Sequence, residues 1–173
     1  DEGLVHARER IPQAEFIQLD ARLMTYTVSH DVIGAFDVIE HIEGDELVLN
    51  NLANALRSGG SLLLTVPQHR WLWSSVDEQA CHVRRYSRKE LMNKVSKTGL
   101  KVKYVSSFVS FLVPLMWLSR LRAKAQGDAS SEFDIPNWLN QLLEGVMSIE
   151  IWLMRRGINF PIGGSLILVA KKS

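Results

Sequence analysis

The sequence predicts an α/β fold, a doubly wound and mostly parallel sheet with helices packed against it. Two observations predict this class. Short β-rich stretches alternate with stretches whose apolar residues recur at helical spacing, and the connections between them are short. With 173 residues, 46% of them hydrophobic, the chain is large enough for one domain with its own core. Ligands in such sheets bind at the carboxyl ends of the strands, so a functional site is expected there.

The first half of the chain supplies five of these elements in order. Residues 4–11 have a helix-like pattern, and residues 15–20 form a short alternating strand that ends in an acid. Residues 31–36 are more continuously apolar, as is typical of a strand buried on both faces. A helix over 45–56 and a strand over 61–66 follow.

The second half contains a helix over 87–99, whose start is marked by a serine followed three residues later by a glutamate. A strand over 102–106 and a last strand over 165–170 are separated by residues 108–160, where two apolar helical segments interrupt the alternation. The sequence therefore predicts one partial domain over 1–173 that carries a helical insertion over 108–160.

Composition indicates which kinds of substrate and binding partner are expected. Twenty basic and nineteen acidic residues leave a net charge of +1, which argues against a nucleic-acid-binding surface and favours a small-molecule or lipid-linked substrate. Cys81 is the only cysteine, so neither an intrachain disulfide nor a cysteine zinc site can form. No apolar run approaches the roughly 18 to 20 residues of a spanning helix. We expect a soluble, cytoplasmic protein.

An acidic and histidine-containing segment follows the predicted strand 31–36. On a helical turn Asp37, Glu40 and His41 would share one face, which could bind a divalent metal with His69 or His82 as a further ligand. Without a metal, His41 could act as a general base. A third interpretation is a partly buried histidine paired with a neighbouring acid.

The connection over 68–86 is long and contains many aromatic, histidine and arginine residues. Such loops beyond the carboxyl end of a strand commonly bind or cover substrate. Its tryptophans offer apolar surface, and its convergent polar residues are Asp77, His82, Arg84 and Arg85. We take Asp77 and His82, together with His41, as candidate catalytic residues. The alternative is a loop packed on the sheet by its own aromatics, with the arginines paired to local acids.

The apolar run over 108–118 is followed by Arg120, Arg122 and Lys124. A basic-flanked apolar helix can lie on an anionic membrane surface, so residues 108–125 are a candidate peripheral membrane contact. The alternative is that this segment and the apolar stripe over 138–152 pack on each other or on a partner chain.

Three stretches together resemble a known family in their order and spacing: FIQLDA (16–21), DVIGAFDVIEHI (31–42) and ALRSGGSLLLTVP (55–67). The chain resembles the class I S-adenosylmethionine-dependent methyltransferases, particularly the type 11 and type 12 group related to ubiquinone-pathway O-methyltransferases. The resemblance covers nearly the whole chain apart from the helical insertion. It implies a Rossmann-like fold, S-adenosylmethionine as methyl donor, and a small-molecule or a lipid- or glycan-precursor acceptor.

The resemblance also implies roles for five residues in cofactor binding. Asp20 would accept the exocyclic amine of adenine and the amide of Ala21 would meet a ring nitrogen, whereas Ala35, Phe36 and Asp37 would lie beneath the adenosine and sulfonium. Asp20 could instead cap a turn, and Phe36 could be core. An acid-x-x-Glu-His set similar to the one around His41 coordinates a metal in the small-RNA 2′-O-methyltransferases.

Two of the family's features have no counterpart in this sequence: the glycine-rich turn after the first strand and the acid after the second. The chain also opens at Asp1 without an initiating methionine. We therefore expect an N-terminally truncated chain that lacks the first strand of the sheet, with an exposed edge through which two copies could pair. Such a fragment could be inactive alone. The rival hypothesis is a non-catalytic binding or scaffold domain with a degenerate methyltransferase fold.

Overall fold

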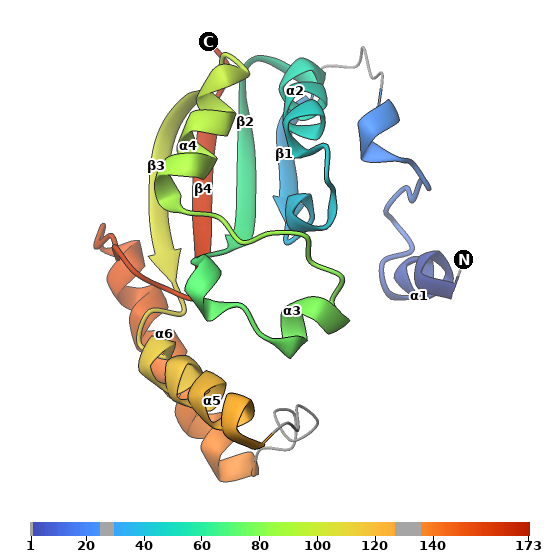
Figure 1. Cartoon of the computed structure of the whole chain (residues 1–173). Coiled ribbons are helices and arrows are strands. Elements are labelled where there is room, and N and C mark those ends of the chain that lie inside the picture. The colour runs from blue at the N-terminus through green and yellow to red at the C-terminus, as the bar shows by residue number, and fades with distance from the viewer. Residues whose placement is uncertain (1, 25–29, 127–135) are drawn as a thin grey trace.

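The computed structural model describes residues 2–24, 30–126 and 136–173 and is built around a four-stranded mixed sheet (Figure 1). The strand order is β1 (His30–Phe36), β2 (Leu56–Pro67), β4 (Ser165–Lys171) and β3 (Lys101–Phe108). β1 is parallel to β2, whereas β4 is antiparallel to both β2 and β3. Three strands thus run in one direction and β4 in the other, which confirms the predicted α/β class with a mostly parallel sheet.

Two helices pack on one face of this sheet and form the core with it. They are α2 (Asp45–Ala55) and α4 (Arg88–Lys97), and both lie in front of the strands in Figure 1. Ser87 caps α4 through the predicted capping box, with the Ser87 side chain accepting from the Glu90 amide. Leu49 on α2, Leu91 on α4 and alternate residues of β2 and β4 are fully buried between the layers.

The strand predicted over 15–20 is wrong. Residues 2–10 form α1 (Glu2–Arg10), but residues 15–20 have no regular structure, and Ile17 and Leu19 are exposed. A strand needs a neighbour whose amides and carbonyls it can pair with, and in the described part of the chain β1 pairs only with β2. An apolar and alternating pattern by itself supplies no such partner.

The connection after β2 folds over the carboxyl ends of the strands and contains a 3-10 turn, η3 (Arg70–Leu72), and a short helix, α3 (Ser75–Gln79). It returns to the carboxyl end of β2, where Gln68 and Tyr86 form an isolated parallel β-bridge. The Tyr86 hydroxyl then donates to Asp45 (2.8 Å), which also accepts from Lys94 (2.7 Å). This buried carboxylate ties the loop and α4 to the start of α2.

The predicted helical insertion forms a hairpin of α5 (Val113–Gln126) and α6 (Asn137–Arg155). Glu150 of α6 is fully buried, and its carboxylate accepts hydrogen bonds from the amides of Ser110 (2.8 Å) and Phe111 (3.1 Å), just beyond β3. These charge-assisted bonds hold the hairpin at the end of the sheet. None of the helices in the described residues is both long and apolar enough to cross a bilayer.

Candidate active site

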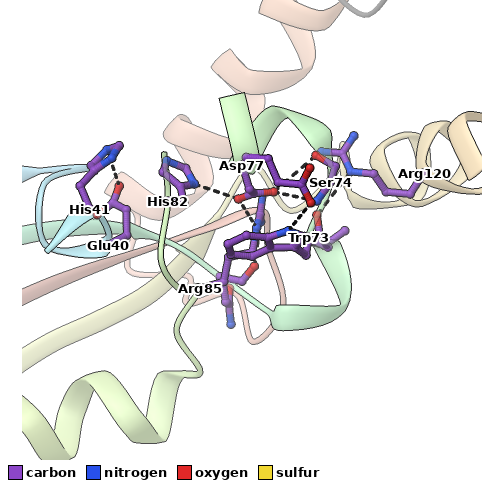
Figure 2. Close-up of polar contacts among 11 residues, drawn as sticks. Glu40, His41, Trp73, Ser74, Asp77, His82, Arg85 and Arg120 are labelled. Atoms are coloured by element: carbon purple, nitrogen blue, oxygen red, sulfur yellow. Dashed lines mark hydrogen bonds and ion pairs between the residues drawn. The ribbon is translucent and has the colours of Figure 1, made fainter. Parts of the chain in front are cut away.

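The candidate site lies at the carboxyl ends of β1 and β2, where two connections meet. β1 ends at Phe36 and is followed by the 3-10 turn η2 (Ile39–His41). The amide of Val83, in the connection after β2, donates to the Glu40 carbonyl (2.9 Å). This contact brings His82 next to η2, as Figure 2 shows.

Asp77 and His82 form a hydrogen-bonded pair at this site. His82 Nδ1 lies 2.9 Å from Asp77 Oδ1, and Arg85 donates to both oxygens of the same carboxylate at 2.7 and 3.0 Å (Figure 2). Burial raises the pKa of Asp77, but the hydrogen bonds from Arg85 and His82 outweigh it and leave that pKa below its usual value. An ionised Asp77 fixes the proton of His82 on Nδ1 and leaves Nε2 available as a base.

Local sequence explains why Asp77 is held in place. Ser74 caps α3 through a capping box in which the Asp77 carboxylate accepts from the Ser74 amide (2.9 Å). The Asp77 side chain is fully buried, and Arg85 is 7% exposed. The carboxylate therefore has hydrogen bonds on every side and cannot easily change orientation.

Glu40, His41 and His82 form a second cluster, which shares His82 with the first. Their potential ligand atoms lie within 4.8 Å of one another, and the rings of His41 and His82 meet edge to face with centroids 4.7 Å apart. Glu40 is fully buried, and neither of its carboxylate oxygens has a hydrogen-bond partner. Two imidazoles and one carboxylate with free lone pairs are a donor set that fits a divalent metal such as zinc, iron or manganese.

Burial raises the pKa of Glu40 to about 7. In the unfolded chain the group titrates near its ordinary value of 4.5, so between that pH and about 7 the folded state binds more protons than the unfolded one. The free energy of unfolding should therefore fall as the pH rises through this window, by about 3 kcal/mol in total.

We expect the Glu40→Gln variant to remove most of this fall, because glutamine has no charge to bury. Urea unfolding at pH 5 and pH 8 measures the effect. The variant and wild type should be similarly stable at pH 5, and the variant more stable at pH 8. An equal fall in both proteins would mean that Glu40 is not the group responsible.

Of the other predicted ligands, Asp37 and His69 lie outside this cluster. Asp37 is exposed with a positive φ of 51° and precedes η2, because the predicted helical turn is only a three-residue 3-10 turn. The Asp37 side chain therefore does not lie on the same helical face as Glu40 and His41. His69 instead stacks on Trp71 (5.1 Å between centroids), and its buried Nε2 has no hydrogen-bond partner. Burial, then the charge of Arg85, lowers the pKa of His69.

The residues that the resemblance assigned to the cofactor lie in two places. Ala35 is buried in the core, whereas Phe36 at the end of β1 is exposed, with its ring folded over Gly34. An exposed ring beside a glycine offers a flat apolar surface at the strand end, which fits an adenosine. The Asp37 amide donates to the Thr65 carbonyl (3.0 Å) and thereby joins the ends of β1 and β2.

Asp20 and Ala21 lie beside α2, where Asn51 donates to the carbonyls of Ala21 and Arg22 (both 3.0 Å). The Asp20 carboxylate caps the 3-10 turn η1 (Ala21–Leu23) and pairs with the Arg22 side chain (2.7 Å). The hydrogen bonds from Arg22 lower the pKa of Asp20 to about 2. Asp20 thus does cap a turn, and a cofactor would have to compete with Arg22 for its oxygens.

The interpretation in which the arginines of the loop pair with local acids is confirmed. Arg85 is the bidentate partner of Asp77 and also donates to the Gln68 carbonyl (3.0 Å), and Arg84 pairs with Asp45 (2.8 Å). Sequence reasoning missed one contact at this site. Arg120, on α5, donates to the Leu72 carbonyl (3.3 Å) and so connects the insertion to the loop. No local pattern in the sequence indicated this contact of Arg120.

Comparisons with known proteins identify the fold. No family model matches the sequence, and no significantly similar curated protein is found. Among solved structures, a methyltransferase-like protein of Bacillus halodurans, described as a putative methyltransferase, aligns with a TM-score of 0.59 and 17% identity over 98% of this chain and 78% of its own. The [4+2]-cyclase SpnF aligns with a TM-score of 0.55 and 16% identity over 98% of this chain and 61% of its own.

A putative sarcosine dimethylglycine methyltransferase from Galdieria sulphuraria is similarly close, with a TM-score of 0.54 and 18% identity over 97% of this chain. The chain spans 61% of the cyclase and 64% of this methyltransferase, less than two thirds of each. At such low identity the comparisons establish the fold, and the chain has the class I methyltransferase fold.

Proposed function

We propose that the full-length protein is an S-adenosylmethionine-dependent methyltransferase whose acceptor is a small molecule or a lipid or glycan precursor. The observation that carries the proposal is the Asp77–His82 pair at the carboxyl edge of a class I methyltransferase fold. An acceptor hydroxyl or amine must lose a proton as it takes up a methyl group. His82 Nε2 would accept that proton, and the ionised Asp77 would stabilise the resulting imidazolium.

S-adenosylmethionine supplies an electrophilic methyl group when bound. In this proposal the carboxyl end of β1 binds the adenosine of S-adenosylmethionine, with Ala35, Phe36 and Asp37 beneath it. Asp20 and Ala21 would bind the adenine. The pair between Asp20 and Arg22 lies in solvent, where an ion pair contributes little, so exchanging it for a ligand costs little.

A metal-assisted reaction is a second candidate, favoured by the buried Glu40 carboxylate, whose oxygens accept no hydrogen bond and whose Oε1 lies 4.0 Å from His41 Nε2. Glu40, His41 and His82 would hold the ion, which would polarise an acceptor hydroxyl. His82 cannot be a metal ligand and a general base through the same nitrogen. The two candidates therefore exclude each other at that residue.

Titration of the full-length protein with Mn²⁺ and Zn²⁺ in a calorimeter separates them. If the metal site exists, we expect His82→Ala and Glu40→Gln to weaken binding by about tenfold or more, because each removes a ligand. Glu43→Gln is the control, since Glu43 is an exposed acid outside the cluster, and it should bind normally. Binding that depends on Glu43, or no binding at all, would contradict the metal-assisted candidate.

The rival hypothesis of a non-catalytic binding or scaffold domain is tested with S-adenosylhomocysteine. Calorimetric binding of this product by the full-length protein supports a methyltransferase. Absence of binding there would favour the scaffold. The comparison with SpnF makes this test necessary, because that protein is described as a cyclase although it has the same fold.

A further inference from the structure

The outer side of α6 carries an apolar stripe that its contacts with the rest of the described chain leave uncovered. Trp138, Leu142, Ile149 and Trp152 recur at helical spacing and are 66%, 55%, 57% and 50% exposed. The side that packs inward is different and contains the buried Glu150. α6 therefore has apolar residues on a side of the helix that does not pack against the described part of the protein.

α5 also leaves apolar side chains exposed. Leu115, Trp117 and Leu118 are between 40% and 53% exposed. Isolated exposed apolar residues are ordinary, but a helix that leaves four of them along one face marks an interaction surface. The two tryptophans of the α6 stripe are typical of a surface that meets the boundary between lipid and water.

Within the two helices as the structure describes them, basic residues outnumber exposed acids. α5 contains Arg120, Arg122 and Lys124 and no acid, and α6 ends in Arg155 with Arg156 after it, whereas the connection over 127–135 contains Asp128, Glu132 and Asp134. Of the two acids on α6, Glu150 is buried by its backbone hydrogen bonds, which leaves Glu144. The guanidinium of Arg156 also lies over the Trp152 ring (3.7 Å), at the border of the apolar stripe. Basic residues at the margin of an apolar face complement an anionic lipid surface.

The hairpin projects from the carboxyl edge of the sheet, beside the loop that carries α3 (Figure 1). Arg120 joins it to that loop through the Leu72 carbonyl. A surface that contacts the hairpin therefore lies at the same end of the molecule as the Asp77–His82 pair.

We propose that the α5/α6 hairpin docks on the surface of an anionic lipid bilayer, with the α6 stripe of Trp138, Leu142, Ile149 and Trp152 buried among the lipid headgroups. The helices lie along the interface and do not cross it. This extends the contact expected over 108–125 to α6, which presents the more exposed stripe. A second copy of the chain on the same face is the competing occupant.

Flotation of the full-length protein with vesicles of phosphatidylglycerol and phosphatidylcholine tests the proposal, with pure phosphatidylcholine vesicles for comparison. We expect flotation with the anionic vesicles that weakens at high salt. Leu142→Ser should lower vesicle partition about tenfold, since it removes one inserted side chain. Its matched control is Leu47→Ser on α2, a helical leucine of similar exposure (51%) away from the hairpin, which should float like wild type.

Two further variants separate the contributions of apolar surface and charge. Trp138→Ser/Trp152→Ser should abolish flotation at any salt, whereas Arg155→Gln/Arg156→Gln should lower it several-fold at low salt and make little difference at high salt. Absence of flotation by the wild type would overturn the proposal. So would equal losses in Leu142→Ser and Leu47→Ser, or a dimer that Leu142→Ser dissociates without vesicle binding by the wild type.

The vesicle assay contains neither methyl donor nor acceptor. Its outcome is therefore independent of whether the protein proves to be a methyltransferase.

Discussion

The His82→Ala variant should transfer methyl groups about 10²- to 10⁴-fold more slowly than wild type, the range expected when a general base is removed. His82 is the histidine whose Nδ1 is held by a buried, ionised carboxylate, so its Nε2 is oriented as a proton acceptor. The measurement is the transfer of labelled methyl from S-adenosylmethionine by the full-length protein to acceptors in an extract of its host.

His6→Ala is the control for this variant, because His6 is an exposed histidine on α1 far along the chain from the site. It should transfer methyl groups at the wild-type rate. His82→Ala should still bind S-adenosylhomocysteine, because the proposed adenosine contacts are on other residues. Wild-type transfer by His82→Ala would remove His82 from the mechanism, both as base and as metal ligand.

The Arg85→Gln variant should lose about 3 to 5 kcal/mol of unfolding free energy, because it leaves the Asp77 carboxylate buried without its main partner. Arg85 is almost fully buried and donates through two nitrogens to Asp77, so solvent cannot replace it. The quantity to measure is the urea midpoint, with the slope of the unfolding curve as a check that the transition stays two-state.

The double variant Asp77→Leu/Arg85→Met distinguishes lost charge from lost packing. It removes both charges and keeps apolar volume, so it should recover most of the stability that Arg85→Gln loses. If the double variant is as unstable as the single one, packing and not the unpaired carboxylate explains the loss. The double variant should have no methyl transfer, since His82 would lose its orienting partner.

The elements that could be predicted are those that a short stretch of sequence specifies without help from distant residues. The helix that Ser87 caps and the apolar pattern of 61–66 each specify their element by themselves, and both form as predicted. The strand over 15–20 failed because pairing is a property of two segments, and the pattern in one of them cannot show that the other is alongside. The direction of β4 likewise depends on how the chain returns through the α5/α6 hairpin.

The candidate site divides in the same way. Asp77, His82 and His41 were identified by residue type within two connections expected to meet at the carboxyl edge. Which atoms meet could not be read from the sequence, because it depends on tertiary contacts such as that between Val83 and Glu40. The expected face shared by Asp37 and Glu40 assumed an α-helical turn, whereas the chain turns more tightly and leaves Asp37 outside.

The position of β4 in the sheet has a consequence for synthesis on the ribosome. β4 lies between β2 and β3, and its partner residues on β2 precede it by about 100 residues, as Ser61 opposite Lys171 illustrates. β2 and β3 emerge first but have no contact with each other until β4 enters between them. The edges of β2 and β3 that face β4 therefore stay unpaired in the nascent chain until β4 is synthesised. An incompletely translated molecule should for this reason bind chaperones or aggregate more readily than the complete one.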